Sequence, residues 1–126
     1  MSTERFREDR RQKNPTPAEV IDLQIQAYNE RDVVTFCSFY ASDAHVTRLN
    51  DGAEVCGGHE SIRTLYARLF KKSPDLRCEV ISRIELGCFV VDHERVTGIG
   101  DKTSEGVVIY EVRDQRIQMV RILRTD

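Results

Sequence analysis

The last third of the chain reads as four β-strands joined by turns, and this feature constrains the fold more than any other. Gly87 separates the first two segments, a polar stretch over 100–104 separates the next two, and Asp114-Gln115 has the form of a two-residue hairpin loop. Connections this short join antiparallel neighbours, so we predict an antiparallel meander. Its strands are expected at 78–86, 88–97, 105–113 and 116–124.

Three helical segments and one short strand are predicted ahead of the meander. Thr16-Pro17-Ala18-Glu19 has the form of a capping box and begins the first helix. Asp32 can cap a second, short helix that carries the apolar residues of 33–40, and 45–49 reads as a strand. Gly57-Gly58 opens a third helix with one apolar face. The element order predicts a single α+β domain.

Composition excludes several classes of function. A chain of 126 residues makes one domain, and its net charge of −2 favours binding to neither nucleic acid nor an anionic membrane. No apolar run is long enough to span a bilayer, and the N-terminus lacks the pattern of a secretory signal, so we expect a cytoplasmic protein. The four cysteines match no zinc or haem spacing, and we expect neither a metal nor a cofactor.

The chain is expected to divide into a tail and a domain. Residues 1–14 are mostly charged or polar, so they bury too little apolar surface to be ordered, and we predict a mobile charged tail. A short basic cluster at Arg10, Arg11 and Lys13 could instead contact a partner. The folded domain is predicted at 15–126.

The last two strands are apolar on both faces. On 105–113, Val108 and Tyr110 oppose Val107 and Ile109, and 116–124 repeats the pattern. Helices on one side of an antiparallel sheet normally leave the other side polar. Because no helices remain to cover the second face, we predict a homodimer that packs through the outer face of the sheet.

Several short motifs resemble the nuclear transport factor 2-like superfamily, in the order in which that superfamily carries them. They are 27–36 (AYNERDVVTF), 39–46 (FYASDAHV), 58–62 (GHESI) and 108–117 (VIYEVRDQRI). The resemblance covers about residues 16–124 and includes the SnoaL-like and ketosteroid isomerase-like branches. It implies a cone-shaped fold, in which a curved, mostly antiparallel sheet wraps on the N-terminal helices around a pocket and often dimerises through the sheet.

The ketosteroid isomerase branch offers catalytic positions that can be compared one by one. Its carboxylate base corresponds to Arg48, its acidic oxyanion donor to Val108, and its tyrosine donor falls near Gln24. None of these residues can perform the role found at its position. The chain therefore resembles the branch without its catalytic residues, and we do not expect ketosteroid isomerase activity.

The same correspondence predicts a hydrophobic pocket and a polar group within it. Asp92 and Glu94 stand on one face of their strand, about 7 Å apart by strand rise, and together would form an acid/base pair. Arg48 could lie opposite and hold a carboxylate or an anionic substrate group, with His93 as a helper. The pocket-lining residues are expected to be Tyr28, Val46, Tyr66, Val90, Val108, Tyr110 and Val120.

Two structural interpretations compete with this catalytic one. If the register of 88–97 is shifted, His93 and Arg95 face the pocket and the carboxylates face outward. Alternatively, all four ionisable residues of 92–95 form ion pairs across strands, for example with Arg83 or Glu85.

Two functional hypotheses follow. The first is a small-molecule-binding domain, with an acid/base isomerase, cyclase or hydrolase activity on a compact apolar oxygenated compound. The alternative is a non-catalytic dimerisation or ligand-sensing module.

Overall fold

The computed structural model describes residues 14–125. The predicted tail at 1–14 therefore lies outside the described residues, apart from Asn14. The elements run in the order α2 (Pro17–Asn29), α3 (Val33–Ser38), β1 (Tyr40–Arg48), β2 (Glu54–Gly57), α4 (His59–Lys72), β3 (Arg77–Leu86), β4 (Phe89–Ile99), β5 (Lys102–Arg113) and β6 (Arg116–Arg124).

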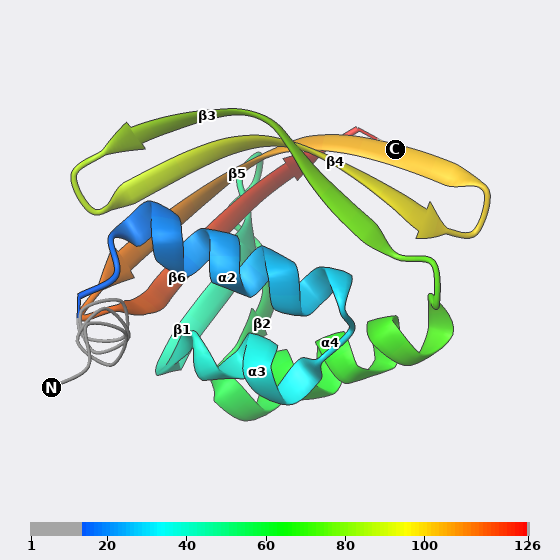
Figure 1. Ribbon diagram of the computed structural model, residues 1–126, viewed down its shortest axis with the longest axis horizontal. Helices are drawn as coiled ribbons and strands as arrows, with labels where there is room; N and C mark the ends of the chain where they lie inside the picture. Colours follow the sequence, from blue (N-terminus) through cyan, green and yellow to red (C-terminus); the bar gives the residue numbers. More distant parts are fainter. Residues whose placement is uncertain (1–13, 126) are drawn as a thin grey trace, which may run out of the picture.

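All six strands form one curved sheet in the order β2-β1-β6-β5-β4-β3. β3 to β6 make an antiparallel meander, and β1 pairs parallel to β6. Asp114 and Gln115 have φ angles of 52° and 61°, as the predicted tight hairpin loop requires. The sheet arches over α2, and α3 and α4 lie on the same side (Figure 1). The predicted α+β fold with a mostly antiparallel curved sheet is confirmed.

The starts of the first two helices are also confirmed. The Thr16 Oγ1 atom accepts a hydrogen bond from the Glu19 amide at 3.1 Å, and the Glu19 carboxylate accepts one from the Thr16 amide at 2.8 Å. Asp32 accepts a hydrogen bond from the Thr35 amide and begins α3. Local side-chain chemistry therefore sets where α2 and α3 begin.

Two details of the prediction ahead of the meander were wrong. The second helix ends at Ser38, and Tyr40 belongs to β1, where it pairs with Ile117 of β6. The four-residue strand β2 was not predicted, because its exposed, partly polar residues carry little apolar pattern. It forms because the turn around Gly52 returns the chain alongside β1.

The core lies between the inner face of the sheet and the helices. An aromatic cluster of Tyr28, Phe36, Tyr66 and Phe70 fills the space where the three helices approach each other, with the Phe36 and Tyr66 ring centroids 4.6 Å apart. None of the helices within 14–125 is long and apolar enough to cross a membrane. Two of the few buried polar residues, Asp92 and Glu94, lie on the inner face of the sheet.

Candidate functional site

The strand β4 places two carboxylates on the inner face of the sheet. Burial alternates along the strand, with Val90, Asp92, Glu94 and Val96 buried and the residues between them partly exposed. This alternation follows from the two-residue period of a strand. Asp92 and Glu94 are 0% and 2% exposed, so both carboxylates are removed from solvent.

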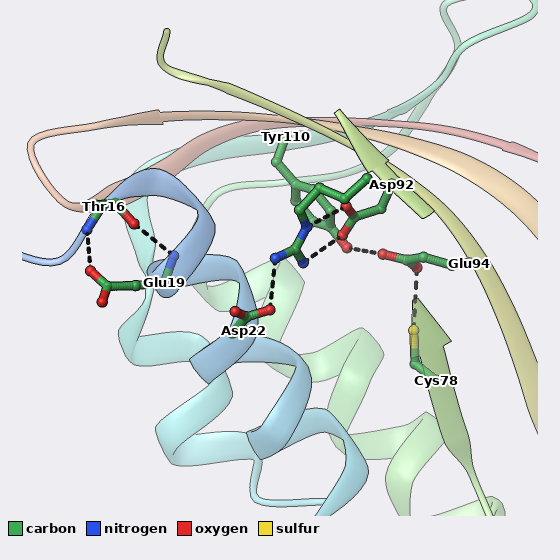
Figure 2. Close-up of polar contacts among 8 residues, drawn as sticks. Thr16, Glu19, Asp22, Cys78, Asp92, Glu94 and Tyr110 are labelled. Atoms are coloured by element: carbon green, nitrogen blue, oxygen red, sulfur yellow. Dashed lines mark hydrogen bonds and ion pairs between the residues drawn. The ribbon is translucent and has the colours of Figure 1, made fainter. Parts of the chain in front are cut away.

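Asp92 is held in an ion pair with an arginine of the neighbouring strand. The Arg83 Nε and Nη2 atoms donate to the two Asp92 carboxylate oxygens at 2.7 and 3.0 Å. The same guanidinium donates from Nη1 to Asp22 of α2 at 2.8 Å (Figure 2). Arg83 therefore joins β4, β3 and α2, and both oxygens of Asp92 are occupied by it.

Glu94 lies in a different environment, without an ion pair among the described residues. The Tyr110 hydroxyl donates to its Oε2 atom at 2.7 Å, and the Cys78 thiol donates to its Oε1 atom at 3.4 Å (Figure 2). Burial raises the pKa of Glu94 above its ordinary value, although these two hydrogen bonds act in the opposite direction. A carboxyl group of this kind keeps its proton to a higher pH than an exposed glutamate does, as many functional acids do.

Glu94 also lines a small internal cavity between the sheet and the helices. The volume of the cavity is about 30 Å³, which is about the space of one water molecule. Three of the lining residues, Tyr66, Ile122 and Arg124, are only partly buried and mark the side nearest the surface. The complete lining is Gln24, Ile25, Tyr28, Phe36, Tyr40, Tyr66, Cys78, Glu94, Val108, Tyr110, Val120, Ile122 and Arg124.

Several polar atoms of this lining have no partner in the described part of the chain. The Oε1 atom of Gln24 and the Nη1 atom of Arg124 are fully buried without a hydrogen bond. Within 14–125, the hydroxyls of Tyr28, Tyr40 and Tyr66 also show no hydrogen bond, but they do not belong to the fully buried unpaired atoms. Because buried polar groups are almost always paired, this concentration in one cavity is unusual.

The structure brings together most of the pocket-lining residues expected from the sequence. Tyr28, Tyr66, Val108, Tyr110 and Val120 line the cavity beside Glu94. Val46 and Val90 are fully buried in the core but do not line it.

Two of the expected catalytic residues lie elsewhere. Arg48 is exposed at the end of β1, where its guanidinium pairs with Asp51 at 2.8 Å, so its predicted position opposite the carboxylates was wrong. The turn that follows β1 brings Asp51 within reach of Arg48 and accounts for this placement. His93 lies on the outer face, paired with Glu105 at 2.8 Å, and does not assist Glu94.

The interpretation of 92–95 as cross-strand ion pairs holds for three of the four residues. Asp92 pairs with Arg83, His93 pairs with Glu105, and Arg95 lies within 3.6 Å of Glu79 and 3.5 Å of Glu105. The register with His93 and Arg95 facing inward does not occur. Glu94 alone keeps a carboxyl group available to the cavity.

Sequence reasoning missed Arg124 and Cys78 as members of the site. Strand parity could have found Arg124, because it follows Val120 and Ile122 on the same face of β6. Gln24 was considered only as the counterpart of a tyrosine. The described residues contain no group of three histidine, cysteine or acidic side chains that could hold a metal ion.

Comparisons with known proteins relate the chain to one domain family by sequence and to solved structures by fold. A family model described as the SnoaL-like domain matches residues 21–120. No curated protein matches the chain in sequence. An uncharacterised cystatin-fold protein from Novosphingobium aromaticivorans superposes with a TM-score of 0.81 at 25% identity, over 88% of this chain and 100% of that one.

Two further solved structures share the fold at lower identity. A SnoaL-like polyketide cyclase candidate from Shewanella denitrificans has a TM-score of 0.75 at 17% identity, over 89% of this chain and 92% of that one. A protein with a ketosteroid isomerase-like fold from Catenulispora acidiphila, solved with trimethylamine, has a TM-score of 0.72 at 17% identity. The match covers 86% of this chain and 85% of that one.

Proposed function

This chain belongs to the SnoaL-like domain family, and we propose on that basis that it binds a compact oxygenated small molecule in the cavity beside Glu94. Glu94 is the residue that exchanges a proton with the ligand. The observation that carries the proposal is a buried carboxyl group of raised pKa, facing a cavity in which other polar atoms lack partners. Perturbed acids in such surroundings are typical of functional sites.

The surroundings of Glu94 suit acid/base chemistry. Tyr110 and Cys78 hold the carboxyl group in place, and its raised pKa lets it keep a proton to a higher pH than an exposed glutamate does. Such a group can protonate or deprotonate carbon next to a carbonyl, which is the chemistry of isomerases and cyclases. The name of the Shewanella relative points to a reaction of this type. Asp92 takes no part, because Arg83 binds both of its oxygens.

The binding proposal can be tested by NMR titration of the full chain with compact ketones, hydroxy acids and epoxides. At least one compound is expected to shift the amide resonances around Val108, Tyr110 and Val120, which line the cavity. The amides of exposed β3 residues such as Glu85 should stay unchanged. If no compound of the panel shifts the cavity resonances, a ligand-binding role for the cavity is contradicted.

Replacing Glu94 with glutamine tests whether the pKa of Glu94 is raised in the folded protein. Because burial raises its pKa above 4.5, the folded protein binds this proton more tightly than the unfolded chain does. The wild type is therefore expected to lose stability as the pH rises from about 4.5 through the folded-state pKa.

Glu94→Gln removes this loss, so its free energy of unfolding relative to that of the wild type should rise over the same pH range. Urea unfolding at a series of pH values measures the difference, and Glu79→Gln is a control at an exposed position. If the free energy of unfolding varies with pH in parallel for the wild type and Glu94→Gln, the pKa of Glu94 is not raised in the folded protein. In the presence of a ligand that turns over, Glu94→Gln should bind it and leave it unchanged.

A second candidate is a ligand-sensing module without catalysis. The observation that favours it is the size of the cavity, which Tyr66, Phe36 and Tyr110 reduce to about 30 Å³. The NMR titration separates the two, because a sensor binds a compound of the panel and returns it unchanged.

We also propose that the domain forms a homodimer through the outer face of the sheet. This face carries Val91, Val107, Ile109 and Met119, with Leu123 42% exposed, and no helix of the described chain covers it. Sheets of this kind pack face to face about 10 Å apart. Glu111 and Arg121 place both signs of charge on the same face, so each can meet an opposite charge across a two-fold axis.

The dimer is tested by Ile109→Glu, which buries a charge in the proposed interface. Light scattering should give twice the chain mass for the wild type and the mass of one chain for the variant. Val34→Glu is the matched control, because Val34 is an apolar residue 63% exposed on α3 and should leave the dimer intact. A wild-type mass of a single chain contradicts the proposal.

A further inference from the structure

A row of three residues crosses the inner face of the sheet beside the cavity. Glu94 of β4 pairs with Gly106 of β5, and Gly106 pairs with Arg124 of β6. Neighbouring strands lie about 4.8 Å apart, so the backbones at Glu94 and Arg124 are separated by about 10 Å. Because Gly106 has no side chain, the middle of the row is open to the residues on either side.

Arg124 uses the space that Gly106 leaves. A Cβ atom at position 106 would lie 2.9 Å from the Arg124 Cγ atom and 2.5 Å from the Leu123 carbonyl oxygen. The aliphatic part of the Arg124 side chain therefore lies over Gly106 of β5 instead of extending perpendicular to the sheet from β6. Its charge lowers the pKa of Glu94 against the effect of burial, and it lowers the pKa of Tyr66 as well. Both effects place the guanidinium near the cavity.

The charge of Arg124 has no counterion in the described chain. Its Nη1 atom is buried without a hydrogen bond, and no ion pair of Arg124 occurs within residues 14–125. Glu94 is the only acidic residue of the cavity lining, and burial favours its neutral form. Arg124 is partly exposed, but its buried Nη1 atom is left without an acceptor, which is costly, so an anionic acceptor in the cavity would be bound favourably.

The helix side of the cavity supplies the complementary group. Gln24 of α2 is 4% exposed, and its Oε1 atom has no donor within hydrogen-bond distance. The amide oxygen can only accept a hydrogen bond. A ligand that pairs both orphan atoms supplies an acceptor to Arg124, for which an anion matches the charge best, and a donor to Gln24.

We propose that the cavity binds a short 2-hydroxy acid, with its carboxylate on Arg124 and its hydroxyl donating to Gln24. A guanidinium matches a carboxylate in shape and charge, and an adjacent hydroxyl is the simplest donor that accompanies one. The cavity has the volume of about one water, so even a short acid fits only after the partly exposed Tyr66 side chain moves to admit it. This inference names the ligand class for the function proposed above and rests on it.

The test compares three probes that differ by one group each: lactate, propionate and propane-1,2-diol. NMR titration of the full chain should show lactate binding most tightly. Propionate lacks the hydroxyl and should bind about 3- to 10-fold more weakly, and the diol lacks the charge and should bind at least about 10-fold more weakly. Equal affinity of propionate and lactate would overturn the role of Gln24.

Variants of residues on β6 test whether Arg124 is the cation that binds the carboxylate of the ligand. Arg124→Gln should weaken lactate binding at least about 10-fold, and Arg124→Lys should recover part of it because the charge is restored. Arg116→Gln is the matched control, since Arg116 lies exposed at the start of the same strand. Backbone NMR spectra of each variant establish that it is folded, so a loss of binding reports on the site.

Three outcomes would overturn the inference. Unchanged lactate affinity in folded Arg124→Gln would show that Arg124 does not bind the ligand. If the neutral diol binds as well as lactate, the anionic ligand class fails while a small-molecule function of the cavity stands. If none of the probes shifts the cavity resonances and the ketones and epoxides also fail, both the ligand class and the proposed function are wrong.

Discussion

Replacing Arg83 with methionine is expected to lower the free energy of unfolding by about 3 to 5 kcal/mol, which is a large share of the stability of a domain of this size. The physical reason is the fully buried Asp92, whose two carboxylate oxygens both accept hydrogen bonds from Arg83. Without the guanidinium, a carboxylate is left buried and uncompensated. The contact with Asp22 is lost as well, but its carboxylate is 64% exposed and contributes little.

A double variant separates the cost of leaving Asp92 without its ion pair from the cost of altered packing at position 83. Arg83→Met/Asp92→Leu removes both charges, so it should recover most of the stability that the single variant loses. Arg95→Met is the control, because Arg95 is 40% exposed and its ion pairs are long, and it should cost under about 1 kcal/mol. Urea unfolding at one fixed protein concentration measures all four proteins, since a dimer makes stability depend on concentration. A loss below about 1 kcal/mol for Arg83→Met would show that Asp92 finds another partner.

Replacing Phe36 with alanine is expected to cost a similar amount, about 3 to 5 kcal/mol, and to enlarge the cavity at the same time. Phe36 is 1% exposed, and its ring centroid lies 4.6 Å from that of Tyr66 and 5.1 Å from that of Tyr40. Because the surrounding rings come from α2, α4 and β1, they are held by different elements and cannot all close the gap.

The enlarged cavity provides a second measurement on the same variant. The space that the Phe36 ring leaves is bordered by the rings of Tyr28, Tyr40, Tyr66 and Phe70, which favour a small aromatic molecule. Saturating benzene should therefore raise the melting temperature of Phe36→Ala but leave that of the wild type unchanged. Phe39→Ala serves as the control, because Phe39 is partly exposed and does not line the cavity. A melting temperature of Phe36→Ala that does not respond to benzene would indicate that the core collapses into the space.

Much of the fold follows from local patterns. The meander is predictable because short turns and alternating residues leave few other ways to pair strands, and the tight loop at Asp114-Gln115 forms as its length requires. The capping residues Thr16 and Asp32 act through atoms within three residues of themselves. The strand β2 escaped prediction because its existence depends on pairing with β1, not on a pattern of its own.

The candidate site was predictable in part. The inward direction of Glu94 and Tyr110 follows from strand parity once the sheet face is known. Arg48 obeys the same parity as Val46, yet its strand ends there and Asp51 captures its guanidinium. Parity therefore predicts the face of a residue but not whether its long side chain reaches the cavity.

The amino-acid sequence thus dictates the order of the elements, their caps and turns, and the alternation that turns one face of the sheet toward the helices, because each of these depends on neighbours along the chain. Packing alone determines that Arg83 neutralises Asp92, that Gly106 lets Arg124 cross toward Glu94, and that the aromatic rings leave a cavity between them. These contacts join residues far apart in the chain, and their geometry depends on how the sheet curves over its helices. The difference between the ion-paired carboxylate of Asp92 and the cavity-facing carboxyl group of Glu94, two residues apart on one strand, arises at that level.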